Sequence, residues 1–588
     1  MPGKKPIELN ETLNVLLGNL FGDLDKNSIK QIFDSLRQVE LQTGDYLFHQ
    51  GEDQNDMYIL LSGRLRAISE NNGDLLILGD IGVGETVGEL GFFTKETRTA
   101  SVLAIRNSIV LEITQDKFIE LVSINPKLTS SVIQLIIKRL KRNTFELNKG
   151  FPPKNIAIIN LQKRNNIGDL TKIVQSSFQE MEVPVQIHDA QSYHSKHPEE
   201  LFNSLEQHEG LNILLCDNEH QEWANQCLIY ADLIVVATAF NADEQIYEIE
   251  KCSNIYTKNI LNKKTYLLLL HPPEGEMPDN TNRWLKDRNI DLHIHMRQKN
   301  HQDIRRFCRI ISNRAIGLVL GGGGSKGFAH LGVVQALQER GIEIDFLGGT
   351  SAGALYGIGM SFNDFDFKKI KQINGEAVRR KLTSGGYALP MISLKTGNKF
   401  KAYLKEMFGE HHLEDIWINS FCVSTNFSKS ALHIHDSGLV WKQILASMSI
   451  PGVFPPVVID KHLHVDGGVM DNLPIEPMYH YPVDTIIAVS LSSLEIREVN
   501  YQELPSSGIL AIDKLRKKKR YKVPGIASLI MNSLIANSTQ KQEQSKDMAN
   551  HYIPLELKGF GLLDDKKWKQ IMQKGYEQTI AYLDSTKL

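Results

Sequence analysis

A chain of 588 residues is too long for one hydrophobic core, since single cores stop growing at roughly 250–300 residues, so several domains are expected. Its hydrophobic fraction of 41% and charged fraction of 23% are ordinary for a soluble globular protein. A net charge of -3 gives no overall field that would attract nucleic acid or an acidic membrane, so a charged partner must meet a local patch.

The five cysteines are scattered, odd in number and without a CxxC pair. This pattern argues against a disulfide framework and a zinc knuckle, and it favours a reducing cytoplasm. The N-terminus lacks an apolar run of signal-peptide type, and no stretch reaches about 18 apolar residues. We therefore expect a cytoplasmic chain that is not secreted and has no transmembrane helix.

The first segment, from about residue 38 to 115, consists of short alternating runs separated by turn glycines. This pattern predicts a small β-barrel or β-roll. Amphipathic stretches before and after it, 13–36 and 115–147, predict flanking helices. The Pro152–Pro153 pair then marks a boundary, so residues 1–150 form the first predicted domain.

The second segment, residues 151–313, alternates apolar strand-like runs with helical stretches, which predicts a parallel α/β sheet. The expected strands are 156–161, 213–215, 233–236 and 266–270. No glycine-rich loop follows these strands, so the phosphate-cradling device of a nucleotide site is missing. We therefore expect a spacer or docking domain.

The third segment, residues 314–588 with a core at about 316–480, opens a second α/β pattern. Three glycine motifs follow in order: Gly-Gly-Gly-Ser-Lys-Gly at 322–327, Gly-Thr-Ser-Ala-Gly at 349–353 and Asp-Gly-Gly at 466–468. Each motif is common alone, but their order is specific. The predicted fold is thus multi-domain α/β: an N-terminal β-roll, a central parallel α/β domain and a C-terminal α/β domain that carries the chemistry.

Ser351 is the predicted nucleophile of this third domain. In a Gly-x-Ser-x-Gly motif the serine lies on a sharp strand-to-helix turn, whose strained backbone requires minimal neighbours. Gly349 and Gly353 are those neighbours, 342–347 is the expected strand, and a helix is expected to begin at Ala352. The positive end of that helix would stabilise negative charge on the attacking oxygen.

Asp466 is the predicted base. It can accept the serine proton directly if it lies within hydrogen-bond reach, and such a dyad requires no histidine. Gly467 and Gly468 would let the aspartate loop approach the elbow closely. The oxyanion would form against backbone N–H groups of the first glycine motif. The candidate residues of this oxyanion hole are Gly322, Gly323, Gly324, Lys326 and Gly327.

Two nucleotide-binding motifs compete for the same glycine loop. Its spacing also matches a dinucleotide fingerprint, with Glu343 and Asp345 about twenty residues on. We disfavour this alternative because the second strand runs straight into the 349–353 elbow, where a ribose-binding turn should be. A P-loop is excluded, since Lys326 is followed by glycine rather than by serine or threonine.

These motifs resemble the patatin-like phospholipases, and the stretches 317–332, 449–456 and 465–474 resemble the neuropathy target esterase branch specifically. A segment at 283–305 is similar to the one that precedes the hydrolase in that family. The resemblance implies a Ser351/Asp466 dyad that hydrolyses acyl esters of lysophospholipids, phospholipids or simpler carboxylic esters, without a metal or another catalytic cofactor. The chain departs from the family in having one nucleotide-type domain instead of several and no N-terminal transmembrane helix.

Residues 44–63 resemble the β-roll of cyclic-nucleotide-binding domains, and 87–102 resemble its phosphate-binding cassette. By that resemblance Glu89 accepts from the ribose 2′-hydroxyl and Arg98 pairs with the phosphate charge. The implied contact residues are Gly88, Glu89, Leu90, Arg98 and Thr99. The implied effector is cAMP or cGMP, and the alternative is a docking module without a ligand.

Two further patterns have weaker meaning. Histidine pairs at 293/295, 433/435 and 462/464 place two imidazoles on one strand face, but no third ligand is identified, so no metal is expected. A basic run over 514–522, followed by an amphipathic stretch at 526–535, suits peripheral contact with an anionic membrane, with a solvated loop as the alternative.

Two function classes stay open on these observations: a regulated hydrolase of a lipid or ester substrate, and a cyclic-nucleotide sensor or scaffold that acts by protein binding with little catalysis. A transcription factor is disfavoured, because residues 158–161 lie in a strand where a helix-turn-helix would stand, and nucleic acid is not an expected partner. The acyl chain, the head group, the nucleotide and the oligomeric state also stay open.

Overall fold

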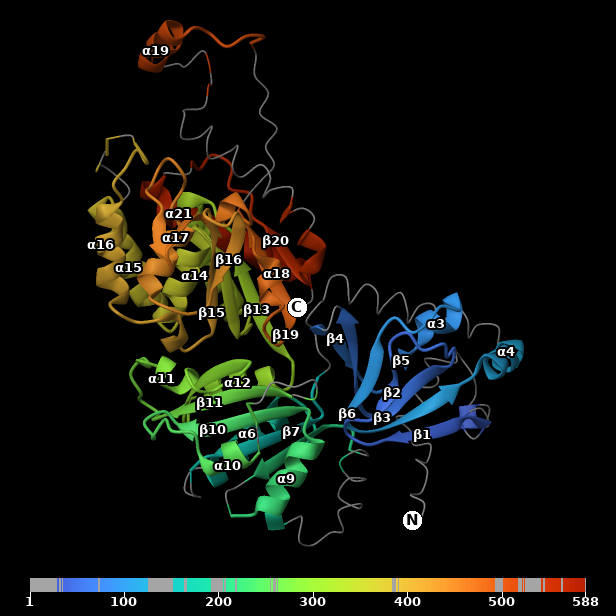
Figure 1. The fold of residues 1–588 in the computed structure, drawn as a ribbon. Coiled ribbons are helices and arrows are strands. Elements are labelled where there is room, and N and C mark those ends of the chain that lie inside the picture. Colours follow the sequence, from blue (N-terminus) through green and yellow to red (C-terminus); the bar gives the residue numbers. More distant parts are fainter. Residues whose placement is uncertain are drawn as a thin grey trace. The chain divides into compact units, whose positions relative to one another are not determined.

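The structure is a computed structural model, drawn as a ribbon in Figure 1. It describes residues 29–30, 33, 35–71, 74–124, 152–162, 167–191, 205, 208–216, 219–253, 255–256, 261, 263–382, 386, 388–389, 391–491, 501–516, 521, 523, 541–542, 545–561 and 564–586. The chain divides into two compact units. The first comprises Met1–Glu276, Asn282–Ala315 and Tyr479–Asp484, and the second comprises Met277–Thr281, Ile316–Met478 and Thr485–Leu588.

The first unit begins with the predicted β-roll, which is confirmed as a six-stranded antiparallel sheet. Its strands are β1 (Arg37–Leu41), β2 (Tyr46–Phe48), β3 (Met57–Asn71), β4 (Asp74–Ile81), β5 (Thr86–Val87) and β6 (Ser101–Ile113). A short helix, α3 (Glu89–Thr94), lies between β5 and β6, and α4 (Gln115–Ile124) follows β6. Most of the stretches 13–36 and 115–147, where flanking helices are expected, lies outside the described residues.

The second part of the first unit is a six-stranded sheet of order β12-β11-β10-β7-β9-β8, with parallel pairing throughout. Its strands are β7 (Asn155–Asn160), β8 (Val185–His188), β9 (Leu211–Cys216), β10 (Leu233–Ala239), β11 (Lys264–His271) and β12 (Leu292–Arg297). Its helices are α6 (Ile167–Glu180), α9 (Gln221–Tyr230), α10 (Glu248–Cys252), α11 (Asn282–Leu285) and α12 (His301–Ile311). The predicted parallel α/β domain is confirmed, but the two edge strands were not among the expected ones, because β8 is short and β12 alternates apolar with polar residues.

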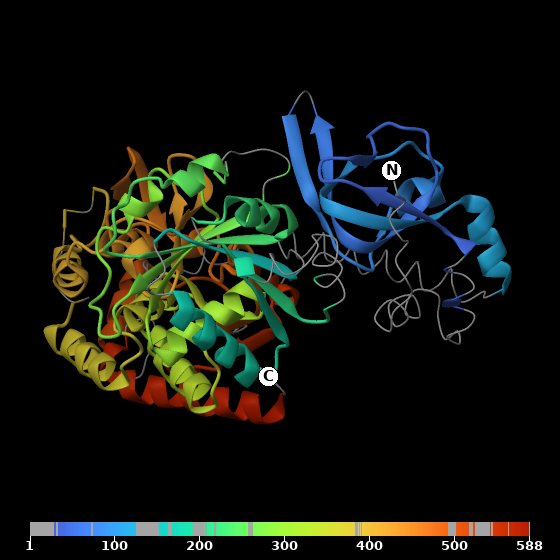
Figure 2. The same cartoon turned by 90° about the horizontal axis from the view of Figure 1, so that it is seen from below.

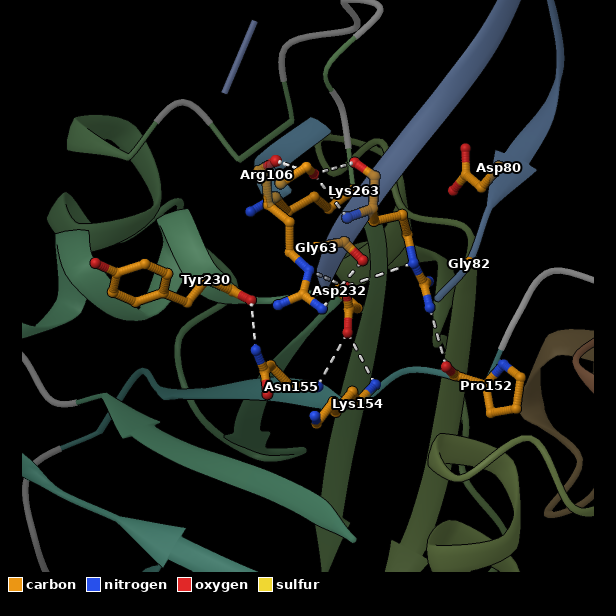
Figure 3. Close-up of polar contacts among 12 residues, drawn as sticks. Gly63, Asp80, Gly82, Arg106, Pro152, Lys154, Asn155, Tyr230, Asp232 and Lys263 are labelled. Atoms are coloured by element: carbon orange, nitrogen blue, oxygen red, sulfur yellow. Dashed lines mark hydrogen bonds and ion pairs between the residues drawn. The ribbon is translucent and has the colours of Figure 1, made fainter. Parts of the chain in front are cut away.

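A buried ion cluster joins the two parts of the first unit. The Asp232 carboxylate, at the start of the β10 region, lies 3.0 Å from Arg106 Nε and 3.6 Å from Arg64 Nε, two arginines of the β-roll. It also accepts the backbone N–H groups of Lys154 and Asn155, and Figure 3 shows these two residues and Arg106 around Asp232. Burial opposes ionisation, but the two arginines and the two N–H donors hold the pKa of Asp232 below its usual value.

The second unit is built on a mixed sheet of order β17-β18-β15-β14-β13-β19-β20, with β16 paired to β15. Its strands are β13 (Ala315–Leu320), β14 (Phe346–Thr350), β15 (Ser420–Asn426), β16 (Ala431–His435), β17 (Val457–Ile459), β18 (His462–Asp466), β19 (Val483–Ser490) and β20 (His551–Pro554). The central pairs β13–β14 and β14–β15 are parallel, whereas β18 runs antiparallel to β15. This order places β14, which ends at the predicted nucleophile, in the middle of the sheet.

Helices accompany this sheet in chain order. They are α13 (Ala329–Glu339), α14 (Ala352–Phe362), α15 (Phe367–Arg380), α16 (Asn398–Phe408), α17 (Val440–Ser447), α18 (Ile475–Met478), α19 (Ser507–Leu515) and α21 (Trp568–Ser585). Figure 2 shows α21, in red, along one side of this unit. It packs so closely on α13 that a Cβ on Gly332 would lie 2.0 Å from Met572 O.

The strand predicted at 342–347 begins later than expected. Residues 340–342 instead close α13: Gly341 has a φ of 72°, its N–H donates to Gln338 O at 2.9 Å, and Ile342 N–H donates to Leu337 O at 2.9 Å. These two bonds form the Schellman arrangement that ends many helices. The strand β14 therefore begins only at Phe346 and runs up to Thr350.

No described helix combines the length and the apolar character needed to span a membrane. Of the segment that suits a membrane surface, residues 526–535 and most of the basic run lie outside the described residues.

Candidate active site

Ser351 lies on the turn between β14 and α14, as the elbow motif predicts. Its backbone has φ 52° and ψ -114°, a conformation that L residues rarely adopt. Such strain costs on the order of 1–3 kcal/mol and persists only where the surroundings enforce it. The Ser351 N–H donates to Ser447 Oγ at 2.9 Å, which helps to hold the turn.

Asp466, at the end of β18, receives the hydrogen bond of the nucleophile. Ser351 Oγ donates to Asp466 Oδ2 at 2.7 Å, and Gly468 N–H donates to the other carboxylate oxygen at 2.8 Å. Both side chains are buried. The structure thus brings together the two residues that the sequence predicts as nucleophile and base, 115 positions apart.

The burial of Asp466 changes its acidity. Loss of hydration raises the pKa of Asp466 to about 6, although the hydrogen bonds from Ser351 and Gly468 act in the opposite direction. A carboxylate with this pKa is still ionised at neutral pH, and it is a stronger base than an exposed aspartate. It is therefore suited to accept a proton from a serine hydroxyl.

The glycines of the three motifs are required by close packing around the dyad. A Cβ on Gly353 would lie 2.0 Å from Leu320 O, and one on Gly467 would lie 2.4 Å from Val423 O. A Cβ on Gly322 would lie 2.5 Å from Asn472 Oδ1 and 3.2 Å from Ser351 Cβ. The glycine loop, the elbow and the aspartate loop can approach one another only because these side chains are absent.

The glycine loop forms a short 3-10 helix, Gly324–Phe328, next to the nucleophile. The Gly322 N–H is already engaged, because it donates to Asn472 O at 3.0 Å. The N–H groups of Gly323 and Gly324 stand at the start of the turn, where helical geometry supplies no acceptor. Lys326 and Gly327 lie inside the turn, and Lys326 N–H donates to Gly323 O at 3.3 Å.

Several supporting residues were not predicted from the sequence. Ser447 accepts the N–H of the nucleophile, Thr350 Oγ1 donates to Asp471 O at 3.0 Å, and Asn472 Nδ2 donates to Gly322 O at 3.3 Å. Asn472 lies in a polar run after the Asp-Gly-Gly motif, which is a usable signal. Ser447 lies at the end of an amphipathic helix and gives none.

The buried histidines of the second unit do not contact the nucleophile. His330 Nε2–H donates to Gly321 O at 2.8 Å, which fixes the start of the glycine loop, and burial lowers the pKa of His330 to about 4. His464 Nδ1 and His435 Nε2 lie 2.8 and 2.7 Å from Ser424 Oγ. Among the described residues, Asp466 is the titratable side chain that is hydrogen-bonded to Ser351 Oγ.

Two clusters bear on metal binding. The rings of His433 and His435 lie 4.6 Å apart and that of His464 lies 5.1 Å from His433, but two of their nitrogens point to Ser424. Within the described part of the chain, the group whose ligand atoms lie within 4.8 Å of one another is Asp279, His411 and Asp415. Both Asp415 oxygens already accept backbone N–H groups, from Thr281 and His412.

The cassette residues of the β-roll also gather in one place. Gly88 caps α3 in the left-handed conformation, and Arg98 donates to Gly88 O at 3.0 Å and to Asp56 O at 2.7 Å. The Arg98 guanidinium lies 4.1 Å from the centre of the Phe48 ring. An open cavity of about 680 Å³ lies here, lined by Gln50, Gly51, Asp53, Lys95, Glu96, Thr97, Arg98 and Thr99.

Glu89 is buried at the start of α3, whereas Leu90 and Thr99 are exposed. The Arg98 Nε–H is buried and has no acceptor among the described residues. An anion at the cassette would supply that acceptor, so the residues present fit a cyclic phosphate.

Curated proteins similar to this chain include two fungal relatives. A protein named lysophospholipase NTE1 from Coccidioides immitis is 26% identical over 94% of this chain and 41% of its own length. A protein named lysophospholipase nte1 from Aspergillus terreus is 27% identical over 94% of this chain and 42% of its own length. The chain therefore spans about two fifths of the length of these relatives.

A solved cyclic nucleotide-binding domain from Methylobacillus flagellatus is 19% identical, with a TM-score of 0.21, and covers 23% of this chain and 79% of that chain. Family models match three successive parts of the sequence. Residues 38–125 match the cyclic nucleotide-binding domain, and residues 174–317 match the neuropathy target esterase family P-loop like domain. Residues 318–479, which contain Ser351 and Asp466, match the patatin-like phospholipases. The chain thus carries a patatin-like phospholipase domain that follows a cyclic nucleotide-binding domain and a neuropathy target esterase P-loop-like domain.

Proposed function

We propose that this chain is a carboxylic ester hydrolase that cleaves acyl ester bonds of lysophospholipids and phospholipids, with Ser351 as nucleophile and Asp466 as base. The observation that carries the proposal is the 2.7 Å hydrogen bond from Ser351 Oγ to Asp466 Oδ2, buried beside the glycine loop. The name lysophospholipase on the fungal relatives supports the choice of substrate class.

The dyad would act in two steps. Ser351 Oγ attacks the acyl carbonyl carbon while Asp466 takes the hydroxyl proton, and the tetrahedral intermediate then expels the alkoxide of the glycerol backbone, which leaves with that proton. Water next attacks the acyl-serine ester and gives a proton to Asp466; the second tetrahedral intermediate then expels Ser351 Oγ, which takes that proton back, and the fatty acid is released. Asp466 accepts and returns the proton in both steps of this scheme.

The negative oxygen of each tetrahedral intermediate would face the glycine loop. We assign the donors to the N–H groups of Gly323 and Gly324, because the Gly322 N–H already donates to Asn472 O. Lys326 and Gly327 shape the same turn. One such donor contributes on the order of 3 kcal/mol to the lowering of the barrier.

A hydrolysis screen tests the proposal. Purified protein is expected to release fatty acid from lysophosphatidylcholine and to hydrolyse short-chain carboxylic esters, and a metal chelator should leave both rates unchanged because the dyad needs no cation. Release of fatty acid from diacyl phospholipids, measured beside these, gives the head-group and chain preference. Absence of turnover on every ester would favour the alternative class, a cyclic-nucleotide sensor or scaffold that acts by protein binding.

We further propose that the β-roll binds a cyclic nucleotide, cAMP or cGMP, that regulates the hydrolase. The buried Nε–H of Arg98 and the cavity beside it fit the phosphate, and Glu89 and the backbone at Gly88 and Leu90 would hold the ribose and phosphate, with Thr99 as a further donor. An effector regulates only if it distinguishes two states of the protein.

The Arg98→Lys and Arg98→Ala variants test the nucleotide site. Loss of the charge-assisted contact that Arg98 makes is expected to weaken binding by roughly 30-fold or more, measured by calorimetric titration with cAMP and cGMP. Lys95→Ala, which changes another cation of the same cavity, is the control. Because Arg98 also holds two backbone carbonyls, the melting temperature of each variant must be followed, and unchanged binding in a folded Arg98→Ala protein would contradict the assignment.

We retain residues 1–150, 151–313 and 314–588 as the proposed domains, although the first two lie in one compact unit. We also propose a cytoplasmic protein with peripheral contact to a membrane surface. The contact surface is developed next, from residues of the second unit.

A further inference from the structure

The loop between α15 and α16 exposes several large apolar side chains. Leu389, Met391 and Ile392 are 79%, 83% and 71% exposed, and Leu394 is exposed as well. Single exposed apolar residues are ordinary, but a group of them close together in one loop indicates a surface that contacts something apolar. Figure 1 shows this loop, in yellow at the upper left, beyond the ends of α15 and α16.

A second exposed apolar group lies on two neighbouring turns of the same unit. Phe427, which follows β15, is 67% exposed, and Val458 and Leu463 of the β17–β18 hairpin are exposed too. Phe427 N–H donates to Leu463 O at 2.8 Å, and Val458 is the cross-strand partner of Leu463. The three residues are therefore neighbours on one surface.

The chain segment 449–456 connects these two groups with the dyad. Leu394 N–H donates to Gly452 O at 2.9 Å, which attaches the loop to this segment, and the segment continues into β17. Asp466 N–H donates to Ser449 O at 2.9 Å, so the same segment supports the base. We define the apolar rim as Leu389, Met391, Ile392, Leu394, Phe427, Val458 and Leu463.

We propose that the apolar rim docks onto the surface of a lysophospholipid or phospholipid aggregate and holds the dyad at that surface. The inference rests on the proposed function, because the substrate is then an amphiphile that gathers in such aggregates. Ser351 is only 6% exposed, so the acyl ester has to leave the aggregate to reach it. A rim that is attached to the segment behind Asp466 keeps that path short and away from water.

The charges on the two turns suit the same partner. Lys429 and Lys461 are exposed beside Phe427 and Leu463, and Asp460 offsets part of their charge. Lysines next to apolar side chains match an interface of phosphate head groups above acyl chains, to which each adds a moderate attraction. Anionic lipid is therefore expected to strengthen the docking, while the apolar contact remains its main part.

Vesicle binding tests this inference. In a Ser351→Ala background, which consumes no lipid, the rim variant carries Leu389→Ser, Met391→Ser and Ile392→Ser. The matched control carries Leu75→Ser, Leu76→Ser and Ile119→Ser in the first unit, three aliphatic residues that are also more than half exposed. Co-flotation is measured with vesicles of phosphatidylcholine, and with vesicles that also contain phosphatidylserine.

Each apolar side chain that leaves water contributes about tenfold in partitioning, so the rim variant, which loses three of them, is expected to bind about 1,000-fold more weakly. The control should bind like the parent protein. With Ser351 restored, the rim variant should hydrolyse a short, water-soluble ester at the parent rate and lose turnover on vesicle-bound lysophosphatidylcholine.

Three results would overturn the inference: parent protein that does not bind vesicles, a rim variant that binds like the control, or a rim variant that slows the soluble ester equally. A parent dimer that the rim variant dissociates, seen by light scattering, would assign the rim to a second copy of the chain instead. If no ester is hydrolysed but vesicle binding depends on the rim, the proposed function fails and the docking surface stands.

Discussion

Replacement of Ser351 by alanine is expected to abolish ester hydrolysis, with a fall in turnover on the order of 10⁶-fold. In the proposed mechanism the hydroxyl forms the acyl-enzyme, and among the described residues no other hydroxyl is hydrogen-bonded to the Asp466 carboxylate. Labelling by a fluorophosphonate probe should disappear for the same reason. Alanine can keep the strained backbone of the turn, because the Ser447 hydroxyl bonds to the backbone N–H and not to the side chain.

Ser361→Ala is the matched control for this experiment. Ser361 lies on α14, the helix that follows the nucleophile, and its buried hydroxyl has no hydrogen-bond partner among the described residues. Its removal should leave labelling, turnover and melting temperature close to those of the parent. Persistent labelling of the Ser351→Ala protein would show that another residue is the nucleophile.

Asp466→Asn is expected to lower turnover by on the order of 10²–10⁴-fold with little change in substrate binding. The amide keeps the shape of the carboxylate and can still accept the Gly468 N–H, but it cannot take the serine proton. Steady-state kinetics should show the loss in kcat rather than in KM. Asp460→Asn, an exposed substitution on the hairpin that leads into β18, is the control.

The same residue sets the expected pH dependence. The base works only when ionised, and burial raises the pKa of Asp466 to about 6, so kcat/KM should fall about tenfold for each pH unit below that value and level off above it. The residual activity of Asp466→Asn should lack this ionisation. Near-parental turnover of the variant, or an unchanged acid limb, would contradict the assignment of Asp466 as base.

Motifs in which backbone conformation restricts the residue type were readable from the sequence. The elbow at Ser351 needs Gly353 because a side chain there would collide with Leu320 O, and this demand is visible as a fixed spacing. The alternation of the β-roll and the long apolar runs of the parallel strands were readable for the same reason. The pairing of Ser351 with Asp466 could be predicted because each of the two residues lies in such a motif.

Features that depend on contacts between distant residues were not readable. Ile342 is a β-branched residue of the kind that is common in strands, yet its N–H closes α13 by donating to Leu337 O. In the sequence, only the glycine at position 341 indicates that the helix ends here. Ser447 supports the nucleophile from a helix without any motif. The Gly322 N–H, expected to face the oxyanion, is engaged by Asn472 O, whose position depends on the folded loop.

The cluster around Asp232 limits how this protein can exchange parts with others during evolution. If the β-roll were replaced by one from another protein, Asp232 would lose both of its arginine partners, unless the new β-roll carried arginines at the positions of Arg64 and Arg106. The carboxylate would then stay buried with its two N–H donors but without either arginine, and breaking such a buried pair costs about 3–5 kcal/mol, a large share of the stability of an average domain. We therefore expect recombination points in this lineage to fall outside residues 64–232, so that the β-roll and the sheet beside it are inherited together.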